Sequence, residues 1–159
     1  MTADLAWLAG FYEGEGTLRI NRAGQRNLGI LHASTVSTEQ GYIEEFQRRW
    51  PGSVRLSPAR GSSRQAWRWN LGSTKVGAFL DDIGPYIVGE RMVARIVIAR
   101  QFLALKASRS TLRAPEAYRR ESFDHYLAMR ELNARGPDGP DPDLIAVLAT
   151  CPHADTWRS

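Results

Sequence analysis

The chain has a single cysteine, Cys151, among 159 residues, which excludes an internal disulfide and is typical of a reducing compartment. It has no run of about 20 apolar residues, so we expect no membrane-spanning helix. The N-terminus lacks the basic region and apolar stretch of a secretory signal. Cys151 and His153 have no neighbouring partner ligands, so we expect no zinc site there. We therefore expect a protein that is not secreted and acts in the cytoplasm, of bacterial or phage origin, or in an organelle.

Lysine is scarce, because nearly all basic residues are arginines. A GC-rich genome explains part of this excess but does not explain its position. Residues 16–75 contain ten basic and three acidic residues, a net charge of +7, whereas the whole chain carries +4. Arginine forms bidentate hydrogen bonds with phosphates and with guanine edges. The basic segment is therefore predicted to contact nucleic acid.

A short helix is predicted at the start of the chain, because apolar residues recur there at helical spacing. They are Leu5, Leu8, Ala9 and Tyr12. A second stripe of the same helix, made of Ala6, Gly10 and Gly14, has almost no side chain. Two glycines in a short helix cost roughly 1 kcal/mol each in helix propensity. The stripe therefore indicates that another backbone approaches this helix closely.

Two glutamates, Glu13 and Glu15, stand at the end of this helix. We predict that Gly14 and Gly16 end it by adopting the left-handed conformation. The C-terminal end of a helix is the negative end of its dipole, where carboxylates are disfavoured. The glutamates therefore indicate a bound cation, for which a divalent metal ion is the first choice.

Two hairpins follow, each leading into a helix. Polar and apolar residues alternate in three predicted strands, at residues 17–21, 53–57 and 64–71. Residues 28–36 alternate poorly and are predicted as a strand because they return from the first hairpin loop. Ser37 and Gln40 fit a capping box for a helix that ends near residue 49, with Tyr42, Ile43 and Phe46 inward. Further helices are predicted at residues 73–83, 90–105, 115–133 and 144–148. The order is that of an α+β domain, with helices on one face of an antiparallel sheet. We assign residues 1–135 to this domain and residues 136–159 to a linker and a C-terminal tail.

The second hairpin has one apolar and one polar face. The apolar face carries Val54, Leu56, Trp67, Trp69 and Leu71. Trp67 and Trp69 are able to stack on bases, but they share parity with Leu71, so we predict that they belong to the core. In the first hairpin the faces of residues 28–36 are not assigned by pattern, and His32 is either a DNA contact or a buried histidine.

Residues Leu8–Gly16 resemble the LAGLIDADG motif of homing endonucleases, with glutamate at both acidic positions. The resemblance extends over roughly residues 3–105 and implies an αββαββα fold, in which a four-stranded antiparallel saddle binds duplex DNA. It implies a hydrolase that cuts double-stranded DNA, serves intron or intein mobility, and needs no small-molecule cofactor.

The resemblance also implies the site residues. Glu15 would be catalytic, and Glu15 with the backbone carbonyl of Gly14 would bind Mg²⁺, with Mn²⁺ as a substitute. Glu13 would support the helix end. Because the motif occurs once, the resemblance implies a homodimer on a long, roughly palindromic site, joined through Ala6, Gly10, Phe11 and Gly14.

The polar faces and loops of the two hairpins supply the predicted DNA contacts, since strands can present alternating side chains to a major groove. These contacts are Arg19, Asn21, Arg22, Arg26, Arg55, Ser57, Arg60, Arg64, Arg68 and Asn70.

One position departs from the family. Many members carry a lysine where this chain has Glu90, so the lysine is replaced by Arg91 or by Lys75, or cleavage is impaired. Two alternatives to an endonuclease remain at this stage. One is a binding protein on the same scaffold that does not cut, such as an RNA maturase or a transcriptional regulator. The other is an unrelated α+β protein.

Overall fold

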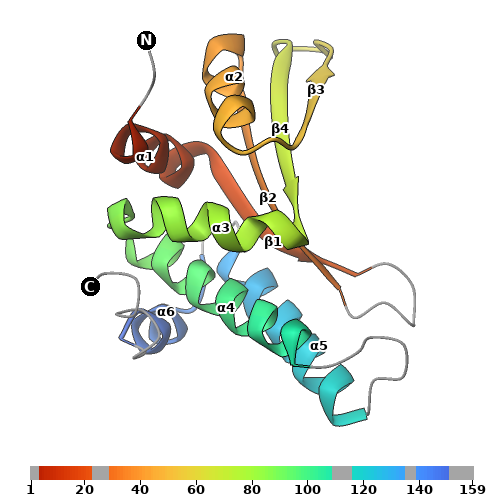
Figure 1. Cartoon of the computed structure of the whole chain (residues 1–159), viewed down its shortest axis with the longest axis vertical. Helices are drawn as coiled ribbons and strands as arrows, with labels where there is room; N and C mark the ends of the chain where they lie inside the picture. Colours follow the sequence, from red (N-terminus) through yellow and green to blue (C-terminus); the bar gives the residue numbers. More distant parts are fainter. Residues whose placement is uncertain (1–3, 23–28, 109–115, 135–138, 151–159) are drawn as a thin grey trace.

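The computed structural model describes residues 4–22, 29–108, 116–134 and 139–150. Its elements follow the predicted order of helix, hairpin, helix, hairpin and helix, with further helices after them (Figure 1). They are α1 (Leu5–Glu15), β1 (Gly16–Asn21), β2 (Ile30–Ser37), α2 (Gln40–Arg49), β3 (Ser53–Ser57), β4 (Ala66–Gly72), α3 (Ser73–Ile83), the 3₁₀ turn η1 (Gly84–Tyr86), α4 (Glu90–Ala107), α5 (Glu116–Leu132) and α6 (Pro142–Ala149). The predicted α+β architecture is confirmed.

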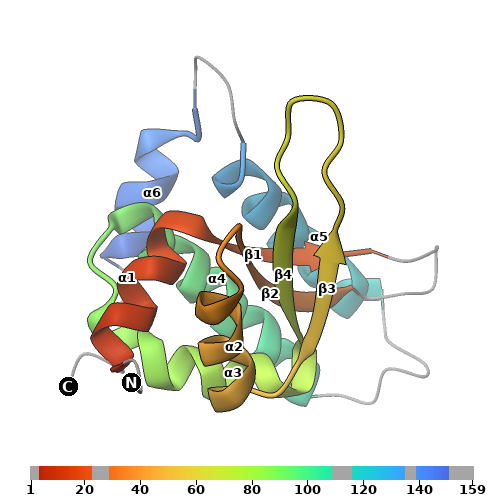
Figure 2. The same cartoon turned by 90° about the horizontal axis from the view of Figure 1, so that it is seen from above.

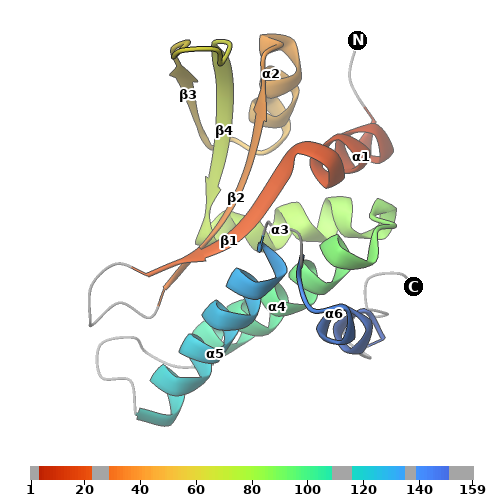
Figure 3. The ribbon, with the colours of Figure 1, turned by 180° about the vertical axis from the view of Figure 1, so that it is seen from behind.

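The four strands form one antiparallel sheet in the order β1-β2-β4-β3. Hairpin β1–β2 and hairpin β3–β4 diverge from each other, so that the sheet curves like a saddle (Figures 1 and 3). Apolar side chains cover one face of the sheet, where α2 and α3 pack. The other face carries the polar residues of each strand.

An aromatic cluster fills the core between α1, α2, α3 and the sheet. Trp69 of β4 is fully buried, and its indole nitrogen donates a hydrogen bond of 3.0 Å to the Trp50 carbonyl oxygen. Trp50 is also buried and donates from its own indole nitrogen to Asp82 at 2.8 Å. Both tryptophans contact Phe79. The prediction that Trp69 belongs to the core is confirmed.

The end of α1 differs from the prediction. Neither Gly14 nor Gly16 adopts the left-handed conformation: Gly14 lies inside the helix, and Gly16 has an extended backbone with φ of −81°. Gly16 is required for another reason, because a Cβ atom there would collide with the backbone oxygen and the ring of Tyr12. The hydroxyl of Tyr12 in turn donates a hydrogen bond of 2.9 Å to the Thr17 carbonyl oxygen.

The start of α2 also differs. Ser37 belongs to β2, and the residue at the N-cap is Glu39, which makes no capping hydrogen bond with its side chain. Gln40 does not reach back as a capping box requires, because its amide donates forward to Glu44 at 2.7 Å. Tyr42, predicted to point inward, is 43% exposed.

Two side chains of the predicted apolar face are exposed, and Trp67, predicted to belong to the core, is partly buried against it. Val54 and Leu56 of β3 are 38% and 45% exposed. They nevertheless lie on the face of the core, because they pair with Trp69 and Trp67 of β4. The parity is right, but β3 is an edge strand and its hairpin extends away from the helices (Figures 1 and 2). Pattern alone does not reveal how far the helices reach along a sheet.

The C-terminal helices pack on the domain. Helix α5 lies against α4 and beside β1, where Asn133 donates a hydrogen bond of 2.8 Å to the Leu18 carbonyl oxygen. Phe123 and Leu127 of α5 are 38% and 42% exposed. Helix α6 packs beside α4 (Figure 2) and buries Leu148. The boundary at residue 136 stays a prediction.

Within the described residues, no helix is long and apolar enough to cross a membrane. Cys151 and His153, for which no zinc site is expected, lie outside these residues.

Candidate DNA-binding face and catalytic site

The open face of the saddle is defined by the strand register. Arg19 of β1 pairs with His32 of β2, and His32 pairs with Gly72 of β4. Arg68 of β4 pairs directly with Arg55 of β3. Since directly paired residues point to the same face of a sheet, these side chains share one surface. Alternate residues of the same strands also lie on this face: Thr17, Asn21, Ser34, Asn70, Ser53 and Ser57.

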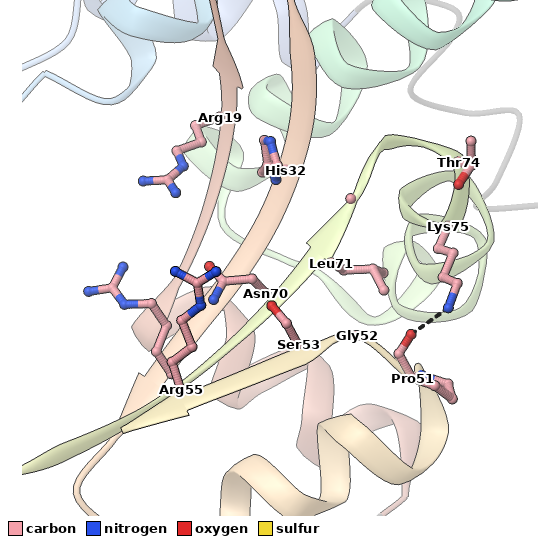
Figure 4. Close-up of a pocket in the computed structure, with 12 residues that line it drawn as sticks. Arg19, His32, Pro51, Gly52, Ser53, Arg55, Asn70, Leu71, Thr74 and Lys75 are labelled. Atoms are coloured by element: carbon pink, nitrogen blue, oxygen red, sulfur yellow. Dashed lines mark hydrogen bonds between the residues drawn. The ribbon is translucent and has the colours of Figure 1, made fainter. Parts of the chain in front are cut away.

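A hollow of about 660 Å³ lies on this face. Four cationic side chains line it from four different elements: Arg19, Arg55, Arg68 and Lys75. Figure 4 shows Arg19, Arg55 and His32 around the hollow, with the Lys75 ammonium donating a hydrogen bond of 2.7 Å to the Pro51 carbonyl oxygen. Among the described residues, no acidic side chain lines the hollow. Such a surface attracts phosphate groups.

His32 lies on the open face and is partly exposed, so the structure does not support the buried alternative. Partial desolvation lowers the pKa of its imidazole below the ordinary value of 6.5, and the neighbouring Arg19 guanidinium lowers it further. The alternation of β2 was too weak to place this residue, and only the pairing with β1 decides its face.

The remaining predicted DNA contacts fall into three groups. Asn21, Ser57 and Asn70 lie on the open face with the arginines. Arg60 and Arg64 are exposed in the β3–β4 loop, because β4 begins at Ala66 rather than at residue 64. The Arg22 guanidinium lies 4.6 Å from the ring centroid of Phe123 in α5, and Arg26 lies outside the described residues.

The carboxylate of Glu15 lies at the last residue of α1, directly before β1. Glu15 and Gly14 are both exposed, and within the described residues Glu15 makes no hydrogen bond or ion pair. The last turn of a helix also leaves backbone carbonyls without helical partners. One carboxylate and one carbonyl are hard oxygen donors of the type that Mg²⁺ takes. In the described residues of one chain, no three His, Cys, Asp or Glu side chains gather as a metal site.

The Glu13 carboxylate is hydrogen-bonded to the start of α4. Its carboxylate accepts hydrogen bonds from the backbone N–H groups of Val88, at 3.3 Å, and of Gly89, which is the N-cap of α4. The negative charge therefore lies at the positive end of the α4 dipole, where it is favourable. This geometry supports the predicted structural role of Glu13, although the helix end that it supports is the start of α4.

A smaller hollow, of about 350 Å³, lies at the end of α1 and includes Gly14, Thr17 and Arg91. The Arg91 guanidinium donates to the carbonyl oxygens of Leu132 and Ala134, at 2.8 and 2.7 Å. Of the two replacements considered for the family lysine, Arg91 is therefore the one beside Gly14. Lys75 lines the hollow of the open face instead, and Glu90 is exposed at the first residue of α4.

The small-residue stripe of α1 faces solvent. Ala6, Gly10 and Gly14 are exposed, and a Cβ atom at either glycine would meet no atom of the described chain within 4 Å. Next to the stripe in the sequence, the exposed side chain of Trp7 contacts the exposed Tyr42 of α2, and both contact Phe11. Sequence patterns did not single out this pair, because its contact joins two helices.

Comparison with solved structures identifies the fold. An archaeal intron-encoded homing endonuclease complexed with DNA matches with a TM-score of 0.66 at 13% identity, over 96% of this chain and 95% of that chain. The homing endonuclease I-CvuI, also solved with DNA, matches with a TM-score of 0.64 at 16% identity, over 91% of this chain and 90% of that chain.

A third match is I-SmaMI, a LAGLIDADG homing endonuclease bound to cleaved DNA, with a TM-score of 0.57 at 15% identity. The match covers 94% of this chain and 49% of the I-SmaMI chain.

The chain has the LAGLIDADG homing endonuclease fold.

No protein-family model matches the sequence, and no curated protein is similar enough in sequence to count as a relative. In the LAGLIDADG fold of this chain, the motif occupies α1 from Leu8 onward, as the sequence predicted. Gly16, which was predicted to end the helix, is the first residue of β1. The single-motif type of the resemblance is consistent with near-complete coverage of I-CvuI.

Proposed function

We propose that this protein is a site-specific endonuclease that hydrolyses phosphodiester bonds of double-stranded DNA with divalent metal ions. One observation carries the proposal: the exposed Glu15 carboxylate immediately precedes the strand that contributes Arg19 to the cationic open face. A duplex bound on that face would have phosphates near the end of α1. The solved proteins that share the fold are homing endonucleases, and several were solved with DNA.

Glu15 and the Gly14 carbonyl are the proposed metal ligands. A divalent ion held there would neutralise charge on the phosphate oxygens and lower the pKa of an attacking water. Glu13 would not join it, because α4 already binds its carboxylate. I-CvuI was solved with DNA in the presence of Mg²⁺, where the DNA was not cleaved, and in the presence of Ca²⁺. These structures support a divalent ion, and the hard oxygen donors at Glu15 and Gly14 favour Mg²⁺, with Mn²⁺ as a substitute.

A homodimer follows from the number of carboxylates. One chain offers a single exposed Glu15, whereas cutting both strands needs one such group for each strand. The open stripe of Ala6, Gly10 and Gly14 would let two α1 helices pack around a two-fold axis. This chain matches almost all of I-CvuI but half of I-SmaMI, as expected for one unit of a pair. The proposed target is a long, pseudo-palindromic site.

A protein that binds DNA without cutting it is the second candidate. It is favoured by the acidic Glu90 at the start of α4 and by the engagement of Arg91 with two backbone carbonyls. Neither residue offers an uncommitted cation beside Glu15.

The decisive experiment incubates the purified protein with a library of random duplexes and Mg²⁺, and sequences the ends that are produced. Parallel reactions contain Mn²⁺ or EDTA. Ends at one defined sequence that depend on metal support the endonuclease. Enrichment of a bound sequence without ends in either metal supports the second candidate, and the absence of both binding and cutting contradicts the proposal.

A further inference from the structure

His32 stands at a gap in the open face. Its neighbour on one side is Arg19, and its neighbour on the other side is Gly72, which has no side chain. A Cβ atom at Gly72 would meet nothing within 4 Å. The imidazole therefore borders open space within the hollow of about 660 Å³, and a group of a bound molecule can reach it there (Figure 4).

Cationic groups surround this gap. Arg19 belongs to β1, Arg55 to β3, Arg68 to β4 and Lys75 to α3, and all of them line the same hollow as His32. Burial, together with the charge of Arg19, keeps the pKa of His32 below its ordinary value. At neutral pH the imidazole is therefore neutral, with one nitrogen that donates and one that accepts a hydrogen bond.

This chemistry distinguishes His32 from its neighbours. The arginines and Lys75 match phosphate oxygens, which position a duplex but carry no sequence information. A neutral imidazole is a weak partner for a phosphate. Its donor can instead bind an acceptor on a base edge, such as the N7 atom of a purine, in the major groove.

We propose that His32 is a specificity-determining residue, which reads one base edge of the bound duplex through the gap above Gly72. The inference rests on the proposed binding of DNA to the open face. Arg19 is three residues after Gly16 along β1, a distance of roughly 10 Å at strand spacing. The base that His32 reads therefore lies nearer the centre of the site than its ends, and a homodimer reads it twice at symmetric positions.

Binding of DNA should also favour protonation of His32. The phosphates offset the charges of Arg19, Arg55, Arg68 and Lys75, and a purine N7 accepts from the imidazolium as well as from the neutral ring. The pKa of His32 is then higher in the complex than in the free protein. The gain in affinity is complete below the pKa of the free protein and is lost as the pH rises through the pKa of the complex.

The test sequences duplexes that the protein retains from a random library in EDTA, so that none is cut. Three proteins are compared: the parent, His32→Gln, and His125→Gln as a matched control in α5, away from the open face. We expect His32→Gln to reduce the preference at one symmetric pair of positions by about fivefold, the worth of one hydrogen bond. The preference of His32→Gln at all other positions should be unchanged. The preference of His125→Gln should be unchanged at every position.

A second variant, Gly72→Val, fills the gap and leaves His32 in place. We expect it to reduce the preference at the same positions, because the base edge can no longer approach the imidazole. The dissociation constant for the retained sequence is then measured between pH 5 and 8. It should decrease as the pH falls for the parent and for His125→Gln, and the decrease should be smaller for His32→Gln.

An unchanged preference in His32→Gln overturns the inference, and so does a uniform loss of affinity without a change in preference, which indicates a phosphate contact. Both outcomes leave the proposed function intact, because the parent still binds a defined sequence. A parent that retains no duplex contradicts the proposed function itself. Melting curves of all variants show whether a loss of binding reflects a loss of fold.

Discussion

The carboxylate of Glu13 accepts a hydrogen bond from the backbone N–H of Gly89, and this contact joins the end of α1 to the start of α4. The two residues are 76 positions apart in the sequence. A Cβ atom at Gly89 would collide with the Glu13 carboxylate, so any side chain at this N-cap would displace the carboxylate from the position that the bond needs. Because Glu13 lies two residues before Glu15, the same contact fixes the turn of helix that presents the proposed catalytic carboxylate.

The first prediction concerns this contact. Glu13→Ala should lower the free energy of unfolding by about 1 kcal/mol, with a range of about 0.5–2 kcal/mol, as is usual for a lost helix cap. Gly89→Ala should have a similar effect, because the new methyl group displaces the Glu13 carboxylate. The double variant should lose little more than either single variant. Urea unfolding of the four proteins measures these differences.

Gly72→Ala is the matched control, since Gly72 is also a helix N-cap but has free space around it. It should lower the free energy of unfolding by less than Gly89→Ala does, because both variants lose the preference of an N-cap for glycine over alanine but only Gly89→Ala displaces a carboxylate. Additive effects of Glu13→Ala and Gly89→Ala would show that the two residues do not act through one contact.

The second prediction concerns the oligomeric state. Gly10→Leu should convert the dimer to a monomer, because a large side chain on the small-residue stripe separates the two α1 helices. The fold should survive, since a side chain at this position starts in open space within the chain. Sedimentation velocity measures the mass. Gly41→Leu places the same side chain at an equally open glycine of α2 and should leave the dimer intact. A Gly10→Leu protein with the mass of the parent would exclude this interface.

The third prediction separates stability from binding. Arg55 and Arg68 oppose each other directly across β3 and β4, and like charges in that arrangement are destabilising. Changing both to alanine should therefore leave the free energy of unfolding unchanged or slightly raised. Affinity for duplex DNA should fall by roughly 1–3 kcal/mol for each arginine, and the dependence on salt should weaken.

Arg48 and Arg49 provide the control for this change, because they lie on α2, on the covered side of the sheet. Their double alanine variant removes the same charge and should keep both the affinity and most of the salt dependence. Equal losses in the two double variants would indicate that net charge, rather than the open face, binds DNA.

Much of the fold was predictable from local signals. Strand alternation gave the correct faces of β3 and β4, since Arg55 and Arg68 share the polar face while Trp69 is buried. Local signals failed where a distant segment decides the outcome. Val54 and Leu56 have core parity but remain exposed, because the helices end before the edge strand. Ser37 has the chemistry of an N-cap, but pairing with β4 keeps it in β2.

The candidate site was predictable in part. The motif placed Glu15 and Gly14 at the exposed end of α1, where the structure has them. The bonds of Glu13 with Gly89, and of Arg91 with the end of α5, were not predictable, because each joins residues far apart in the sequence. His32 was undecided for the same reason, since only its pairing with Arg19 fixes its face.

The fourth prediction concerns the charge at the start of α4. Glu90→Lys should raise the rate of DNA cleavage, because it replaces an exposed negative charge, near the end of α1, with a cation that can stabilise phosphate charge. Single-turnover cleavage of the preferred duplex in Mg²⁺ measures the rate. Glu116→Lys, at the exposed first residue of α5, adds the same charge elsewhere and should leave the rate unchanged. Equal rates in Glu90→Lys and the parent would show that residue 90 does not influence the chemistry.

The central claim is that Glu15 holds the metal ion for cleavage, and the most direct measurement is the single-turnover rate of Glu15→Gln in Mg²⁺. Glutamine keeps the size of the side chain but removes its charge, and Glu15 makes no hydrogen bond or ion pair within the described residues, so the fold and DNA affinity should persist. The account predicts a rate lower by orders of magnitude, with the dissociation constant for the preferred duplex unchanged. A Glu15→Gln protein that cuts at the rate of the parent would contradict it.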